Sequence, residues 1–203
     1  MNTRYALIIG VCFLAIGTYF FLHSNQDIIN YPPKNNTVVA FGDSLVKGVG
    51  ATEGNDFITL LSDKINTPIL NLGVSGETSL QGLSRVDSVI AENPGTVILL
   101  FGGNDYLRKV PQAETFVNLR EIIMKLQSSG AMIVLLGVRG GLLNDRFDTD
   151  FERLAKEMKT LYVPDVLDGL ITHQEFMSDT IHPNDAGYAR IAEKVYEVME
   201  DYR

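Results

Sequence analysis

Cysteine, tryptophan and positive charge are scarce in this chain of 203 residues. It has one cysteine, Cys12, and no tryptophan, and its 17 lysine and arginine residues are outnumbered by 25 aspartate and glutamate residues, which gives a net charge of −8. A single cysteine excludes an internal disulfide and a cysteine-based zinc site, so the hydrophobic core must stabilise the fold. The lack of excess positive charge argues against a nucleic-acid partner, because binding to phosphates requires a basic face.

Long hydrophobic runs are also rare, and one stands out. Residues 5–22 contain no charged residue and follow Arg4. Such a run has about the minimum length that crosses a bilayer, roughly 17 to 18 residues, and exceeds a usual signal-peptide core. We therefore expect residues 1–23 to form an uncleaved signal anchor, a single transmembrane helix that leaves the rest of the chain on the extracytoplasmic side, because Arg4 stays inside. Cleavage of this segment, which would give a secreted or periplasmic protein, is the alternative.

The remainder of the chain is predicted to be a linker followed by one domain. Residues 24–36 contain two prolines, four asparagines and little periodicity, which is typical of a linker. In residues 37–203, short apolar runs alternate with segments of helical periodicity. The predicted strands are residues 38–41, 69–72, 97–101, 132–136 and 161–166, and the predicted helices are residues 57–65, 80–91, 116–126, 151–158 and 186–199. This alternation indicates an α/β fold with a central parallel sheet of about five strands and helices on both faces.

Glycine and small polar residues follow each of the first three predicted strands, at residues 42–44, 73–78 and 102–105. In a parallel sheet, ligands bind at the carboxyl ends of the strands. Glycine at this edge allows a backbone N–H group to approach a substrate oxygen closely. Neither GxxxxGK[ST] nor GxGxxG is present, so no nucleotide cofactor is expected.

Ser44, at the end of the first predicted strand, is a candidate nucleophile. A serine hydroxyl needs a base to accept its proton, and the base needs a third group to hold its tautomer. Of the three histidines, His23 borders the apolar run and His173 has no acid in the three residues before it. His182 has Asp179 three residues earlier, where a turn can bring carboxylate and imidazole together. A lone D-x-x-H pattern is more often a solvated loop, so this assignment depends on Ser44 and the glycine-rich loops.

Four ordered blocks of the chain resemble those of the SGNH hydrolase superfamily, which includes the GDSL esterases and lipases. They are FGDSL at residues 41–45, NLGVSGET at 71–78, GGND at 102–105 and DTIHPN at 179–184. The resemblance spans roughly residues 38–200, with spacing similar to that of the bacterial thioesterase/lysophospholipase/arylesterase group. It implies a three-layer α/β/α sandwich of flavodoxin-like type and a cofactor-independent enzyme that hydrolyses acyl esters or thioesters.

The resemblance also implies a role for each matched residue. Ser44 would attack the acyl carbonyl, His182 would accept its proton and return it to the leaving group, and Asp179 would orient His182. The backbone N–H groups of Ser44 and Gly76 and the side-chain amide of Asn104 would form the oxyanion hole. The second glycine of G-x-S-x-G is absent, which disfavours an ordinary α/β-hydrolase.

The other acidic residues near these blocks are predicted to be structural. Asp43 and Asp105 are expected to hydrogen-bond within their loops and Glu77 to be solvated. No D-x-D spacing accompanies them, so no metal site is expected. The substrates implied by the resemblance are small acyl esters or lipid-like molecules such as lysophospholipids. The alternatives are an O-acetylesterase of cell-envelope polysaccharide and a lipid- or glycan-binding module without catalysis.

Overall fold

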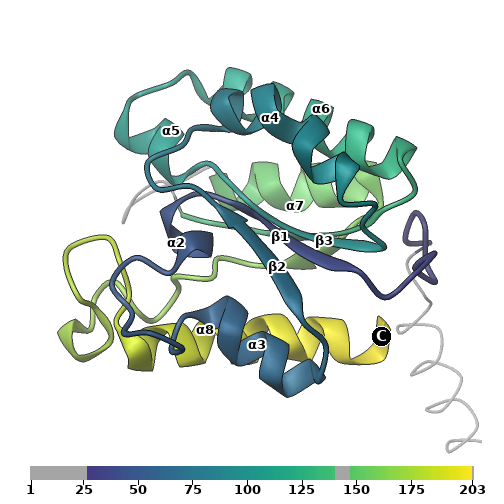
Figure 1. Cartoon of the computed structure of the whole chain (residues 1–203). Helices are drawn as coiled ribbons and strands as arrows, with labels where there is room; N and C mark the ends of the chain where they lie inside the picture. The colour runs from purple at the N-terminus through teal and green to yellow at the C-terminus, as the bar shows by residue number, and fades with distance from the viewer. Residues whose placement is uncertain (1–26, 140–146, 203) are drawn as a thin grey trace, which may run out of the picture.

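The computed structural model describes residues 27–139 and 147–202 (Figure 1). The predicted signal anchor lies outside the described residues and stays a prediction; within them, no helix is long and apolar enough to cross a membrane. Residues 27–36, the described part of the predicted linker, lie against the domain. Ile28 is buried, and the Asn30 amide donates to the carbonyls of Gln127 and Ala131 at 2.8 and 3.0 Å.

A sheet of five parallel strands forms the centre of the domain, which confirms the prediction from the alternating pattern. The strands are β1 (Val38–Gly42), β2 (Ile69–Gly73), β3 (Thr96–Leu100), β4 (Met132–Leu136) and β5 (Leu161–Val163). Their spatial order is β2-β1-β3-β4-β5, the flavodoxin-like order of a doubly wound sheet. Every residue of β1, β3 and β4 is buried, which explains why these strands read as continuous apolar runs.

Helices cover both faces of the sheet and complete three layers (Figure 1). One face carries α4 (Ser79–Ala91), α5 (Gly103–Leu107), α6 (Gln112–Ser128) and α7 (Phe147–Met158), and the other carries α3 (Phe57–Ile65) and α8 (Asp185–Met199). The remaining elements are the short helix α2 (Ser44–Lys47) and the 3-10 turns η1 (Gln174–Phe176) and η2 (Glu200–Tyr202). Strand β5 ends three residues earlier than predicted, because Pro164 follows it and has no N–H to continue the ladder.

Glycines at the ends of β1 and β2 allow α2 to lie directly over the carboxyl edge of the sheet. A Cβ atom on Gly42 would be 2.4 Å from the Leu100 carbonyl oxygen, and one on Gly73 would be 2.3 Å from the Lys47 nitrogen. No side chain fits in either position. The first residue of α2, Ser44, is therefore held at the point where the two strands end.

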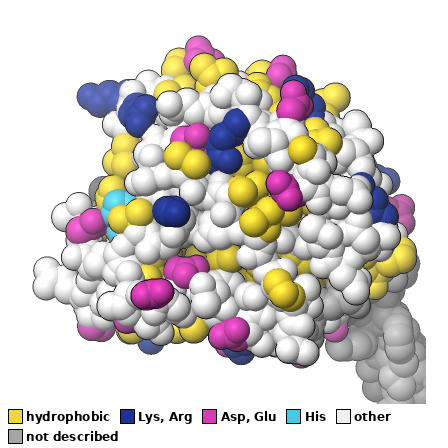
Figure 2. Space-filling model, in the orientation of Figure 1, with side chains coloured by type: hydrophobic (Ala, Val, Ile, Leu, Met, Phe, Trp, Pro, Cys, Tyr) yellow, Lys and Arg dark blue, Asp and Glu magenta, His cyan; other side chains and the backbone are white. Residues whose placement is uncertain are grey.

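The surface in the orientation of Figure 1 does not separate charge by sign. Acidic, basic and hydrophobic side chains are interspersed over this face, with no broad basic area (Figure 2). This face therefore has no broad area of one sign that would attract a highly charged partner.

Candidate active site

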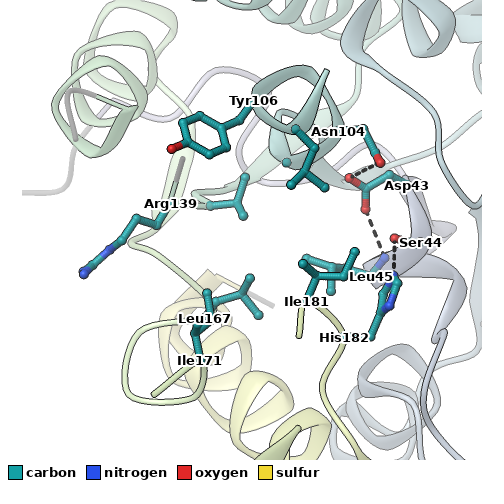
Figure 3. Close-up of a pocket in the computed structure, with 13 residues that line it drawn as sticks. Asp43, Ser44, Leu45, Asn104, Tyr106, Arg139, Leu167, Ile171, Ile181 and His182 are labelled. Carbon is teal, nitrogen blue, oxygen red and sulfur yellow. Dashed lines mark hydrogen bonds between the residues drawn. The ribbon is translucent and has the colours of Figure 1, made fainter. Parts of the chain in front are cut away.

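The structure brings together Ser44, His182 and Asp179, although the serine and the histidine are 138 positions apart. The Nε2 atom of His182 lies 3.0 Å from the Oγ atom of Ser44 (Figure 3). The Nδ1 atom of the same ring lies 2.7 Å from Oδ2 of Asp179. The three side chains form one continuous hydrogen-bonded chain. This is the arrangement in which a carboxylate orients an imidazole to accept the hydroxyl proton of serine.

The Asp179 carboxylate is held in place by its own turn. Its Oδ2 atom contacts His182, and its Oδ1 atom accepts the backbone N–H groups of Ile181 and His182 at 2.8 and 2.7 Å. The hydrogen bond with the His182 side chain, followed by these backbone donors, lowers the pKa of Asp179 to about 2. The carboxylate is therefore ionised at neutral pH and available to stabilise an imidazolium.

The glycine-rich residues 48–54, after α2, pack against the loop that carries His182 and against the start of α8, which follows that loop. The Tyr188 hydroxyl donates to the Val49 carbonyl at 2.7 Å, and the Thr52 backbone N–H and hydroxyl both donate to Asp185 at 2.7 and 2.6 Å. A Cβ atom on Gly50, whose φ is +98°, would be 2.3 Å from the Ser178 hydroxyl. These contacts hold the histidine loop in register with α2 and its serine.

Three hydrogen-bond donors predicted to form an oxyanion hole lie at neighbouring strand ends. Within the described residues, the backbone N–H groups of Ser44 and Gly76 donate to no acceptor. Gly76 has a φ of +80°, and its carbonyl accepts from Arg108 at 2.6 Å. The Asn104 amide donates to Asp43 Oδ2 at 3.2 Å and to the Glu77 carbonyl at 3.0 Å. The two backbone donors are free to stabilise a developing oxyanion, whereas the Asn104 amide must exchange one of its two present acceptors to do so.

Asp43 and Asp105 have the structural roles that the sequence indicates. Asp43 is buried and accepts the Leu45 backbone N–H at 3.0 Å, which caps α2. Asp105 is fully buried and accepts from the backbone N–H and hydroxyl of Ser79 at 2.8 and 2.5 Å, so it ties the loop of Asn104 to the start of α4. In residues 27–139 and 147–202, no group of three or more His, Cys, Asp or Glu side chains is placed to hold a metal ion.

Burial gives Asp43 a measurable effect on stability. Burial, opposed by hydrogen bonds from Leu45 and Asn104, raises the pKa of Asp43 from 3.8 to about 7. Between these two values the folded protein retains a proton that the unfolded chain releases, so raising the pH costs stability. We expect the free energy of unfolding of the wild type to fall from pH 4 to pH 7 relative to that of Asp43→Asn, by roughly 1.4 kcal/mol per unit of pKa difference. Urea unfolding at intervals of pH measures this; parallel curves for the two proteins would contradict it.

The prediction that Glu77 is solvated is wrong. Its side chain is 14% exposed, and its Oε2 atom lies 2.7 Å from both Nε and Nη2 of Arg85 on α4. The sequence offers no specific signal for this pair, because charged residues eight positions apart, one in a loop and one in a helix, have no characteristic spacing.

A cavity of about 170 Å³ opens beside Ser44. The stick view shows it between α5 and the segments around residues 167–171 and 181 (Figure 3). Its apolar wall consists of Leu45, Tyr106, Leu107, Val138, Leu167, Ile171 and Ile181. Arg139 also lines it, but its guanidinium points away (Figure 3), with Nε 3.0 Å from Asp165. The site can therefore hold an apolar group next to the hydroxyl of Ser44.

This chain is similar to known proteins of one family. Esterase TesA of Pseudomonas aeruginosa is 30% identical over 176 residues, which cover 81% of this chain and 88% of that protein. Thioesterase 1/protease 1/lysophospholipase L1 of Escherichia coli is 31% identical over 158 residues, 73% of this chain and 76% of that protein. A crystal structure of TesA is 30% identical, covers 82% of this chain and 99% of its own, and superposes with a TM-score of 0.75. Residues 40–190 match the GDSL-like lipase/acylhydrolase family. The chain therefore belongs to this family of SGNH-fold proteins, and it is a serine hydrolase that acts on ester bonds.

Proposed function

We propose that this protein is an esterase that hydrolyses acyl esters or thioesters with Ser44 as nucleophile, His182 as general base and acid, and Asp179 as the orienting carboxylate. The observation that carries the proposal is the hydrogen-bonded chain from Ser44 to Asp179 at the edge of an apolar cavity. A binding module without catalysis needs only the cavity. It does not need a serine hydroxyl that is hydrogen-bonded to a histidine, as Ser44 is to His182.

The proposed reaction has two steps. The Ser44 Oγ atom attacks the carbonyl carbon while its proton moves to Nε2 of His182, and the resulting oxyanion accepts from the N–H groups of Ser44 and Gly76 and from Asn104. His182 then returns the proton to the leaving oxygen or sulfur as the bond to the carbonyl carbon breaks. Water, deprotonated by His182, attacks the acyl-serine in the same way and releases the carboxylic acid.

The cavity favours an apolar acyl group of limited length. Seven apolar side chains form most of its wall away from the triad, and its volume of about 170 Å³ is small compared with the roughly 300–1,000 Å³ of sites for drug-sized ligands. A polysaccharide O-acetylesterase would place only a methyl group beside Ser44 and leave most of this apolar surface without contact. We therefore favour short to medium acyl chains over acetyl groups.

A series of p-nitrophenyl esters from acetyl to dodecanoyl tests this proposal with the full-length protein. We expect kcat/KM to rise from acetyl to a maximum at short or medium chains and to fall again at dodecanoyl, because each buried methylene adds about 0.8 kcal/mol until the cavity is full. Ile171→Phe, which narrows the cavity, should move the maximum to shorter chains and leave acetyl turnover unchanged. A maximum at acetyl would favour the deacetylase alternative, and inactivity on every ester would contradict the proposed function.

A further inference from the structure

The Arg85 guanidinium joins the two strand ends that lead to the reactive groups. From α4 it donates to the Leu72 carbonyl at 2.9 Å and to the Gly42 carbonyl at 3.2 Å, and its carbon lies 4.5 Å from the centre of the Phe41 ring. Gly42 ends β1, two residues before the nucleophile Ser44, and Leu72 lies at the end of β2. A single cation is thus bound to both segments at the edge where the active site lies.

The same guanidinium also binds the loop that carries the oxyanion donors. Its Nε and Nη2 atoms lie 2.7 Å from Oε2 of Glu77, which follows Gly76. The backbone carbonyl of Glu77 in turn accepts from the Asn104 amide at 3.0 Å. Arg85 therefore bonds to Glu77, which is the neighbour of Gly76 in the chain and the acceptor of the Asn104 amide. Arg85 also bonds to Gly42, at the end of the strand that precedes Ser44.

The ion pair of Arg85 and Glu77 is largely buried, which restricts its geometry. The Arg85 and Glu77 side chains are only 22% and 14% exposed, so water screens their interaction weakly. Hydrogen bonds with an ionised partner are stronger than neutral ones, and a planar guanidinium can reach several acceptors at once in a way that an ammonium cannot. Neither residue lines the cavity beside Ser44. A change in this pair should consequently alter the position of the donors rather than the binding of the acyl group.

We propose that Arg85, acting through Glu77, is a positioning residue that holds the Gly76 N–H and the Asn104 amide at the distance from Ser44 that the transition state requires. The proposal rests on the proposed function, because it concerns the oxyanion of that reaction. An interaction realised only in the transition state changes kcat and leaves KM nearly unchanged, and small displacements of such groups cost one to two orders of magnitude in rate.

The test uses variants of the full-length protein and a p-nitrophenyl ester of the preferred length. Arg85→Met keeps the length of the side chain and removes its charge and donors; we expect kcat to fall about 10- to 100-fold with KM within about twofold of wild type. Arg85→Lys should recover part of the loss, and Glu77→Gln should lose less than Arg85→Met. Arg153→Met is the matched control, since Arg153 is 60% exposed on α7, forms an ion pair with Asp150 and does not line the cavity beside Ser44; its kcat should equal that of the wild type.

A second readout separates positioning from general loosening of the fold. An alkyl boronic acid forms a tetrahedral adduct with an active serine, whereas the product carboxylate binds without one. If Arg85 positions the oxyanion donors, the inhibition constant of the boronic acid rises by about the factor by which kcat falls, and the affinity for the carboxylate stays constant. Equal losses of both affinities, or a kcat of Arg85→Met equal to that of wild type, would overturn the proposal. If Arg85→Met does not fold, the same measurements of kcat and of the two affinities on Glu77→Gln test the proposal. Failure of the proposed function would appear separately, as an inactive wild type or an active Ser44→Ala.

Discussion

Ser44→Ala should lower kcat on p-nitrophenyl esters by about 10⁴-fold or more. The substitution removes the hydroxyl proposed to attack the carbonyl, so the residual rate should come only from the proposed oxyanion donors and substrate binding. The substitution deletes one oxygen atom from a side chain that is 8% exposed, and the hydrogen bond to His182 is its only side-chain contact of this kind among the described residues, so the fold should persist. Steady-state kinetics with the preferred ester measures the fall in kcat, and circular dichroism measures whether the fold persists.

A matched serine provides the control for this experiment. Ser84 lies on the exposed face of α4, where its hydroxyl donates to the Gln81 carbonyl at 2.6 Å, and Ser84→Ala should retain wild-type kcat. A phosphonate ester should add covalently to wild type and to Ser84→Ala, and peptide mass spectrometry should place the adduct on Ser44. A loss below tenfold in Ser44→Ala, or an adduct on another residue, would show that a different group performs the attack.

The sheet could be predicted from the sequence because its central strands are buried on both faces. Such strands must be apolar throughout, and the runs at β1, β3 and β4 are visible without any alignment of relatives. The short helices α2 and α5 could not be predicted, since four or five residues cannot display a helical period. They form because a glycine-rich strand end is followed by residues that must turn back over the sheet.

The grouping of the candidate site residues could be predicted for a different reason. The carboxyl ends of parallel strands meet at one edge, so polar residues after β1, β2 and β3 are expected to face a common point. The three-residue spacing of Asp179 and His182 lets a single turn join them. Only the contact between Ser44 and His182 depends on the fold of most of the domain, because the two residues are 138 positions apart.

The acyl cavity and the Arg85–Glu77 pair could not be predicted. The apolar residues of the cavity come from the short helices α2 and α5 and from separate loops. A single leucine or isoleucine in such a segment has no sequence pattern that distinguishes a cavity wall from a surface residue. Glu77 looks solvated in the sequence, because most glutamates are, and its burial depends on a helix that packs over the loop. These features arise from the packing of elements on one another and not from any single segment.

Asp179→Asn should lower kcat by about 10³- to 10⁴-fold while the protein stays folded. The carboxylate accepts three hydrogen bonds, one from the His182 ring and two from backbone N–H groups, and an amide has only one acceptor atom. If the amide oxygen faces the backbone, its NH₂ group donates to Nδ1 of His182, and Nε2 then carries the proton and cannot accept one from Ser44. If the oxygen faces the ring, the NH₂ group meets two N–H donors. In either orientation, the side chain at position 179 cannot accept all three hydrogen bonds that the Asp179 carboxylate accepts in the wild type.

The pKa of Asp179 decides how this variant should be measured. Because the pKa is lowered to about 2, chiefly by the hydrogen bond with His182, the wild-type carboxylate stays ionised at every pH at which an ester assay is practical. The rate difference between Asp179→Asn and wild type should therefore persist across the pH range of the assay instead of vanishing on mild acidification, as it would if Asp179 titrated there. Asp87→Asn is the control, since that side chain is 84% exposed on α4 and should leave kcat unchanged. A loss below tenfold in Asp179→Asn would mean that the turn at residues 179–182 orients His182 without the carboxylate, and that Ser44 and His182 act as a dyad.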